Sequence, residues 1–265
     1  MKIDYISDIH IDTWQDDLSW LSTRNSTKLI IAGDIADSIK DVEYGLRKIS
    51  PLYEKIYYID GNHEYENCRF AYEDQKQNLR ELCDYLDNVH FLPDNPVIID
   101  NIGIVGCCGW WTFDFAGADP HECSKWLAEE SANWSEYQNI GFSIDQDLIK
   151  YFFKKLSTTD YITLREHINQ IYNNVNKIIV VTHTPCHTGN TTDAYPGSGN
   201  IKGLYGNSMM MNIALSFNKI KYWINGHCHD QTYVKENGIE FINNPRGRPW
   251  DFSRKDYTIE TLSID

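Results

Sequence analysis

The pattern that decides the fold is contained in residues 55–64, which read KIYYIDGNHE. The first half, Lys55–Ile59, is rich in isoleucine and tyrosine and predicts a buried strand. The second half places the polar side chains of Asn62 and His63 directly after that strand. Because open α/β sheets bind ligands beyond the carboxyl ends of their strands, this stretch predicts an α/β protein with a polar site at one edge of a sheet.

The same arrangement, an apolar run followed by a polar cluster, occurs four more times along the chain. The clusters are Asp8 and His10 after Met1–Ser7, Asp34 after Leu29–Ala32, His183 after Lys177–Val181, and His227 and His229 after Tyr222–Ile224. One such cluster alone is weak support for a site. Five in order, each after a predicted strand, indicate a shared site with carboxylate, imidazole and amide ligands for two metal ions.

The residue types and their spacing also indicate what kind of metal is bound. Asp8 and His10 are separated by one residue, so both side chains are expected on the same side of an extended strand end. Carboxylates and imidazoles suit borderline divalent ions such as manganese, iron, cobalt or zinc. Asp34 follows Gly33, which permits a tight turn, and a carboxylate can bridge two metals. The carbonyl oxygen of Asn62 is a further candidate ligand.

The first third of the chain predicts strands and helices in the order βαβαβ. The predicted strands are Lys2–Ile6, Lys28–Ala32 and Lys55–Ile59, the first connection is Asp12–Thr23, and helical patterns follow at Asp37–Ile49 and Glu66–Leu86. Short strands that pair antiparallel are then expected at Phe91-Leu92, Pro96–Ile99 and Ile102–Val105.

The remainder of the chain predicts three helices and a later group of antiparallel strands. The helices are Gln146–Leu156, Leu164–Val175 and Met209–Phe217, and the strands are Lys177–Val181, Tyr222–Ile224, Thr232–Lys235, Ile239–Asn243 and Tyr257–Leu262. The pattern favours two packed sheets flanked by helices. Residues 1–265 are expected to form a single domain, in which the aromatic-rich section Gly106–Thr159 is an insertion or cap-like part. The Gly- and Thr-rich loop Thr184–Asn207 is long enough to be functional.

Composition and charge limit the classes of partner. The formal net charge of −14 argues against an extended surface that binds nucleic-acid phosphates. It is compatible with a small phosphorylated or nucleotide substrate. No apolar run approaches the roughly 18–20 residues that cross a membrane. The chain starts directly with a strand pattern, and its seven cysteines form no CxxC pair, so we expect a cytoplasmic protein with reduced thiols and no membrane partner. No sequence pattern indicates an oligomeric state.

The order of the motifs resembles that of a known family. DxH at Asp8, GD at Asp34, GNHE at Asn62, a lone His183 and GHxH ending at His229 are similar to the calcineurin-like metallophosphoesterase superfamily. The resemblance covers nearly the whole chain and implies a four-layer αββα sandwich of two mixed sheets flanked by helices. It also implies two divalent ions, with manganese as the first expectation and iron, zinc, cobalt or nickel as alternatives.

The resemblance also implies a role for each matching residue. The first metal is expected on Asp8, His10 and His229, the second on Asn62, His183 and His227, with Asp34 bridging the two. His63 is expected to be the catalytic histidine beside the scissile ester, and not a metal ligand.

The expected activity is hydrolysis of a phosphate monoester or diester by attack of a metal-bridging hydroxide. His63 would protonate the leaving group or stabilise the phosphoryl oxygens. A nuclease acting on DNA or RNA is the alternative, although it needs a basic or aromatic groove. A non-enzymatic scaffold of the same fold is a third hypothesis, which the complete set of ligand positions disfavours.

Several aromatic, histidine and arginine side chains are candidates for substrate contacts. Trp111 and Phe113 are candidates for stacking on a nucleobase or another apolar leaving group, with core packing as the alternative. His187 is expected in a substrate loop or exposed to solvent. Arg246 and Arg248 are candidate phosphate clamps, with salt bridges as the alternative.

Overall fold

The computed structural model describes residues 1–14, 18–66, 70–131, 146–191, 202–251 and 256–265. Residues 132–145 of the section Gly106–Thr159 and residues 192–201 of the loop Thr184–Asn207 lie outside the described residues. Short 3-10 helices occur at Ser19–Thr23, Ser50–Leu52, His63–Tyr65, Phe115–Gly117, Tyr172–Asn174, Thr188–Asn190 and Lys202–Leu204. No helix within the described ranges is long and apolar enough to cross a membrane.

Two mixed sheets form the centre of the fold. The first has the order β11-β1-β2-β3-β4, with strands β11 (Glu260–Ser263), β1 (Lys2–Ile6), β2 (Lys28–Ala32), β3 (Lys55–Ile59) and β4 (Val89–Phe91). The second has the order β5-β6-β7-β8-β10-β9, with strands β5 (Val97–Ile99), β6 (Ile102–Cys107), β7 (Lys177–Thr182), β8 (Ile220–Asn225), β10 (Ile239–Asn243) and β9 (Tyr233–Glu236). Within each sheet the central strands are parallel, and antiparallel pairing is confined to β11, β5 and β9 at the edges.

Alternation of side chains along the strands explains why the two sheets stack. In β3, Tyr57 and Ile59 join the apolar cluster between the sheets, while Ile56 and Tyr58 face the opposite cluster. In β7, Ile179 lies between the sheets and Val180 packs against the outer helices. Both faces of these strands are therefore buried, which accounts for their continuous apolar sequence.

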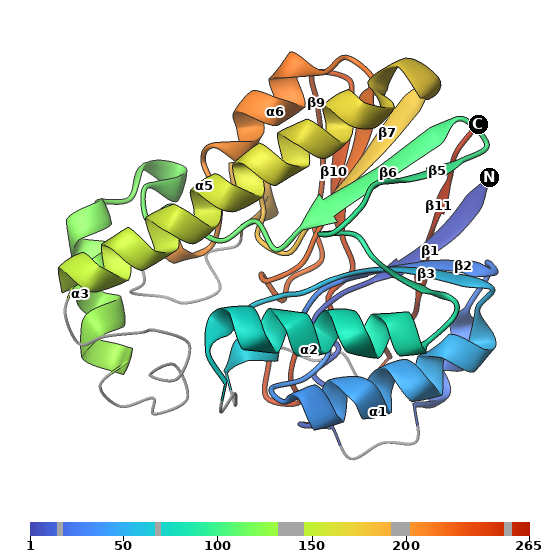
Figure 1. Ribbon diagram of the computed structural model, residues 1–265, viewed down its shortest axis with the longest axis horizontal. Coiled ribbons are helices and arrows are strands. Elements are labelled where there is room, and N and C mark those ends of the chain that lie inside the picture. Colours follow the sequence, from blue (N-terminus) through green and yellow to red (C-terminus); the bar gives the residue numbers. More distant parts are fainter. Residues whose placement is uncertain (15–17, 67–69, 132–145, 192–201, 252–255) are drawn as a thin grey trace.

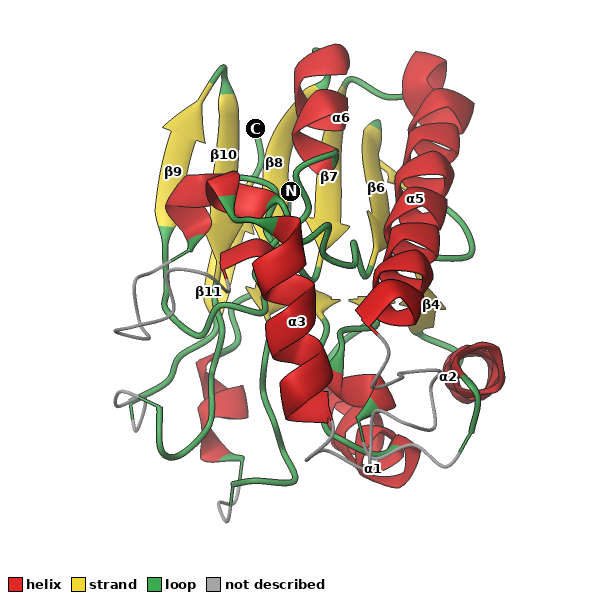
Figure 2. Cartoon of the chain, turned by 90° about the vertical axis from the view of Figure 1, so that its left-hand side faces the viewer, coloured by secondary structure: helices red, strands yellow, loops and turns green. Residues whose placement is uncertain are grey.

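Helices cover the outer faces of both sheets. In Figure 1, α1 (Ile39–Ile49) and α2 (Tyr72–Tyr85) lie below the first sheet, while α5 (Gln146–Ile171) and α6 (Met210–Ser216) lie on the far side of the second. The layers therefore follow the order helix, sheet, sheet, helix, and the expected αββα architecture is confirmed. Figure 2 shows α3 (Pro120–Ser131) beside the beginning of α5.

The sequence pattern wrongly divided one helix into two. We predicted separate helices at Gln146–Leu156 and Leu164–Val175, whereas α5 runs without a break from Gln146 to Ile171. The polar residues that interrupt the apolar pattern face a tertiary contact, because buried Asp160 accepts hydrogen bonds from the backbone N–H groups of Gly109 and Trp110 at 2.7 and 3.2 Å. The helix also crosses Thr159, the boundary that we expected for the aromatic section.

Three further details of the topology differ from expectation. Among its described residues, Asp12–Thr23 contains the short 3-10 helix Ser19–Thr23, and Trp14 and Trp20 make tertiary contacts with Gly247 and Tyr257. Strand β4, expected to pair antiparallel, lies parallel to β3. Strand β8 is also parallel to both of its neighbours, β7 and β10, so the later strands do not all pair antiparallel.

Candidate metal centre

Three of the five polar clusters that follow the strands contain residues in left-handed backbone. Asp8, His10, Asp34 and His227 have φ values of 49°, 39°, 56° and 68°. Our argument from strand alternation was therefore wrong for Asp8 and His10, since a left-handed turn, and not extended backbone, directs both side chains inward. Such conformations cost of order 1–3 kcal/mol each and are typical of functional sites.

Two glycines permit the close approach of the loops. At Gly33, which has a φ of +83°, a Cβ atom would lie 2.6 Å from Nδ1 of His183. At Gly61 a Cβ atom would lie 2.2 Å from Oδ1 of Asp34. Neither contact leaves room for a side chain, so the sequence pairs GD and GN are required by packing.

The carboxylate of Glu64 connects the loop that carries Asp34 with the loop that carries Asn62. Its carboxylate accepts hydrogen bonds from the backbone N–H groups of Gly61 (2.7 Å), Asp34 (3.1 Å) and Ile35 (2.8 Å), and from the hydroxyl of Tyr58 (3.0 Å). The side chain is fully buried. Glu64 thus positions the backbone beneath the candidate ligands.

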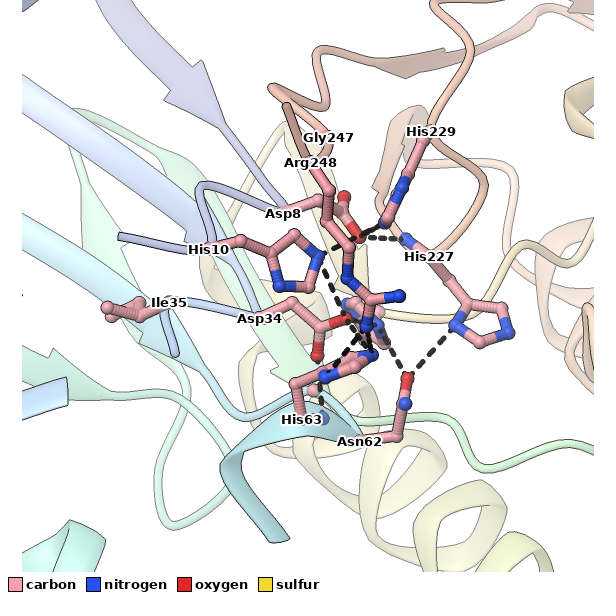
Figure 3. Close-up of polar contacts among 12 residues, drawn as sticks. Asp8, His10, Asp34, Ile35, Asn62, His63, His227, His229, Gly247 and Arg248 are labelled. Carbon is pink, nitrogen blue, oxygen red and sulfur yellow. Dashed lines mark hydrogen bonds and ion pairs between the residues drawn. The ribbon is translucent and has the colours of Figure 1, made fainter. Parts of the chain in front are cut away.

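In Figure 3 the labelled side chains of the predicted clusters point toward one another: Asp8, His10, Asp34, Asn62, His227 and His229. Donor atoms of four residues lie within 4.8 Å of one another in a first group: Asp8, His10, Asp34 and His229. Nε2 of His10 lies 3.1 Å from Nε2 of His229, and the latter lies 3.5 Å from Oδ1 of Asp8. Two imidazoles and a carboxylate therefore converge on one point.

A second group contains Asp34, His183 and His227. Oδ1 of Asn62 lies 3.1 Å from Nε2 of His183 and 3.0 Å from Nδ1 of His227. Oδ2 of Asp34 lies 3.1 Å from Nε2 of His183. Asp34 thus belongs to both groups, as a residue placed between two metal ions must.

The ring nitrogen that faces away from the centre is hydrogen-bonded in three of the histidines. Nδ1 of His183 donates to the carbonyl of Ala32 at 2.8 Å, and Nε2 of His227 donates to the carbonyl of Leu204 at 3.0 Å. Nδ1 of His229 donates to the carboxylate of Asp251. These bonds fix the tautomer that leaves the inward nitrogen available as a ligand.

The unpaired oxygens at the centre test whether a metal fits. Within the described residues, the buried atom Asp8 Oδ2 has no hydrogen-bond donor, and Asp34 Oδ2 faces imidazole nitrogens alone. The other oxygen of each carboxylate is bonded, Asp8 Oδ1 to the backbone N–H of His227 and Asp34 Oδ1 to that of His63, both at 2.9 Å. A buried carboxylate oxygen without a donor is costly unless a cation pairs with it, so the donor set fits divalent ions.

His63 lies beside the two groups and has its own carboxylate partners. Its Nδ1 is 2.8 Å from Oδ1 of Asp37 and 2.9 Å from Oε2 of Glu66. Its Nε2 lies 3.9 Å from Oδ2 of Asp34 and 2.6 Å from Nη2 of Arg248. Burial opposes a charge on His63, but Glu66, Asp34 and Asp37 outweigh it and raise its pKa well above the ordinary value.

The charges of the centre divide the other histidines into two classes. Burial opposes protonation of His183 and His229, but Asp34 for the first, and Asp251 with Asp8 for the second, raise both pKa values to about 9. Burial together with the neighbouring His183 lowers the pKa of His227 to about 4. Burial and the charge of His63 likewise lower that of His10.

Four of the candidate substrate residues, Trp111, Phe113, His187 and Arg246, lie outside the two ligand groups. Trp111 and Phe113 are buried, and Trp111 stacks between His227 and Phe153, with ring centroids 5.7 and 4.8 Å away. His187 is paired with Glu236 at 2.7 Å. Arg246 is buried, with its guanidinium 4.1 Å from the ring of Trp14 and 5.3 Å from that of Trp20.

Two positions beside the centre were missed from the sequence. Asp251 and Glu66, which bind the outer nitrogens of His229 and His63, have no motif that distinguishes them from surface carboxylates. Arg248, predicted together with Arg246 as a candidate phosphate clamp, is the arginine that reaches His63.

Comparisons with known proteins agree with this geometry. A protein of Acanthamoeba polyphaga mimivirus, "Uncharacterized protein L509", is 24% identical over 261 residues, which cover 92% of this chain and 90% of the relative. The fold resembles the phosphopantetheinyl hydrolase of Mycobacterium tuberculosis, with a TM-score of 0.79, 18% identity, and coverage of 100% of this chain and 96% of the other. It also resembles a dimetal phosphatase from Danio rerio, with a TM-score of 0.61, 14% identity, and coverage of 100% and 92%.

The family model described as "Calcineurin-like phosphoesterase" matches residues 1–231, a range that contains every candidate metal ligand. The family is one of metal-dependent phosphoesterases with a dinuclear centre. This chain belongs to the calcineurin-like phosphoesterase family.

Proposed function

We propose that the protein hydrolyses a phosphate ester at a dinuclear metal centre. The observation that carries the proposal is the position of Asp34, whose Oδ2 lies 3.1 Å from Nε2 of His183 and 4.0 Å from Nε2 of His10. One carboxylate oxygen therefore faces ligand groups from both sides of the site. The substrate is a phosphorylated small molecule or a nucleotide-like ester.

Seven residues would hold the two ions. Asp8, His10 and His229 would bind the first, Asn62, His183 and His227 the second, and Asp34 both. Manganese is our first choice because the donors are carboxylate, amide and imidazole groups without thiolate. When bound, two such ions lower the pKa of a water molecule and neutralise phosphoryl oxygens.

His63 is the proposed catalytic acid. A water oxygen forms the new bond to phosphorus, and the bond from phosphorus to the ester oxygen breaks. The leaving oxygen takes the proton from Nε2 of His63, and solvent takes the proton that the water loses. Asp37 and Glu66 support this role, because their carboxylates bind Nδ1 and stabilise the protonated ring.

We also propose a cytoplasmic location and a single domain over residues 1–265. None of the six described cysteines forms a disulfide, which supports a reducing compartment. Helix α5 supports the single domain, because it begins in the section Gly106–Thr159 and ends against the second sheet.

The test is an assay of manganese-loaded protein on p-nitrophenyl phosphate, bis-p-nitrophenyl phosphate, cyclic nucleotides and single-stranded oligonucleotides. Wild type should hydrolyse at least one small ester, and His63→Ala should lower kcat by about 10²–10⁴ with unchanged metal content. His90→Ala, a partly exposed histidine beside Tyr57, is the matched control. Absence of hydrolysis with every metal tested would refute the proposal, and cleavage of oligonucleotides alone would assign a nuclease instead.

A further inference from the structure

The chain segment after β10 is fastened to the metal centre by its backbone. The N–H groups of Arg246 and Gly247 donate to the carbonyls of Ser7 and Asp8 at 3.0 and 2.9 Å. The indole of Trp14 donates to the carbonyl of Gly247 at 2.9 Å. The backbone of this segment is therefore attached by hydrogen bonds to the loop that carries Asp8.

Arg248 is directed into the centre from this segment, as Figure 3 shows. Its Nη2 lies 2.6 Å from Nε2 and 3.2 Å from Nδ1 of His63. Its backbone N–H donates at 2.7 Å to Oδ2 of Asp251, the oxygen that also binds His229. The ring of Trp250 lies 5.8 Å from its guanidinium carbon. Asp251 thus positions both a candidate metal ligand and the arginine beside it.

The charge of Arg248 is available to a ligand. Among the residues that the structure describes, no carboxylate forms an ion pair with its guanidinium, whose contact is with a histidine. The side chain is half-buried, so its charge is poorly screened by water.

We propose that the guanidinium of Arg248 binds the phosphoryl oxygens of the substrate and thereby selects phosphate monoesters over diesters. This inference rests on the proposed phosphoesterase function. A monoester carries a charge near −2 and three non-bridging oxygens, so one or two remain for an arginine after the ions have bound theirs. A diester carries a charge near −1 and only two such oxygens. Binding of the guanidinium to phosphate also releases Nε2 of His63, which then faces the leaving oxygen.

The experiment compares wild type, Arg248→Ala and Arg248→Lys, each loaded with manganese, on p-nitrophenyl phosphate and bis-p-nitrophenyl phosphate. Wild type should prefer the monoester. Arg248→Ala should lower kcat/KM for the monoester by about 10²-fold, as expected for loss of one preorganised donor, and for the diester by less than about 3-fold. Arg248→Lys should fall between, since lysine keeps the charge but not the planar fork. Arg47→Ala, an exposed arginine on α1, should behave like wild type.

Binding of inorganic phosphate, measured by calorimetry, gives a readout independent of turnover. Arg248→Ala should weaken phosphate binding by about 10-fold or more while metal content and melting temperature stay the same. Dimethyl phosphate should bind equally to both proteins. An equal loss on monoester and diester, or unchanged phosphate affinity, would overturn the role of Arg248. If wild type hydrolyses neither ester, the proposed function itself fails, while phosphate binding still tests Arg248.

Discussion

Nε2 of His10 lies 3.1 Å from Nε2 of His229, although the two histidines are 219 positions apart in the sequence. Two imidazole nitrogens at this distance either share a proton or bind a common cation. The carboxylate of Asp8 on the same side, with its Oδ2 lacking a donor in the described structure, favours the cation. Two segments far apart in the sequence therefore meet to form one half of the proposed metal centre.

Asp251 should determine the affinity of the first metal. The carboxylate of Asp251 binds Nδ1 of His229, so Asp251→Ala should free the imidazole to rotate. The affinity for the first metal ion should then fall by about 10–100-fold. Titration of the apo-protein with manganese, followed by calorimetry, measures the change. Asp87→Ala, an exposed carboxylate after α2, is the control. If both sites of Asp251→Ala bind manganese with wild-type affinity, Asp251 does not position His229 for the metal.

Stability and metal affinity should respond oppositely to pH. The metal-free pKa values of His183 and His229 are raised from 6.5 to about 9, and that of His63 is raised as well. Their protonation stabilises the folded apo-protein fully below pH 6.5, and this contribution is lost as pH rises through 9. The free energy of unfolding of the apo-protein should therefore decrease over this range.

Metal binding requires neutral imidazoles, so manganese affinity should increase over the same range and proton release should be measurable near pH 7. Denaturant titrations without metal, and calorimetry in buffers of different ionisation enthalpy, test the two signs. An apo-protein that becomes more stable between pH 6.5 and 9 would contradict the raised pKa values.

Glu64 should matter for stability even without metal. Glu64→Ala leaves the buried N–H groups of Gly61, Asp34 and Ile35 without an acceptor, which should cost at least about 3 kcal/mol of unfolding free energy. Tyr58→Phe removes only one of the hydrogen bonds to Glu64 and should cost about 1 kcal/mol. Urea denaturation of the apo-proteins measures both. Equal effects of the two substitutions would show that Glu64 does not hold the loops.

Those parts of the fold and site that depend on local pattern could be predicted from the sequence. Strands such as Lys55–Ile59 are apolar on both faces, and the polar residues after them fall at the strand ends because the chain must turn there. Prediction from the local sequence pattern was wrong where a tertiary contact determined the structure. Asp160 looks like a helix break, yet it lies inside α5 because it binds two backbone N–H groups of another segment.

Positions that act through distant contacts had no sequence signal. Asp251 is 22 residues from His229 and becomes significant only because β10 lies beside β8 and returns the chain to the site. The choice between Arg246 and Arg248 depends on the left-handed turn at Gly247, with a φ of 72°, which sends one side chain to Trp14 and the other to His63.

The metal content of Asp34→Asn tests the central claim most directly. Wild type reconstituted with manganese should hold about two ions per chain, and Asp34→Asn should lose occupancy at both sites together, because an amide cannot bridge two cations as a carboxylate does. The exposed substitution Asp87→Asn should keep both. Elemental analysis after gel filtration gives the result. Retention of one ion at wild-type affinity in Asp34→Asn would contradict a centre in which Asp34 is shared.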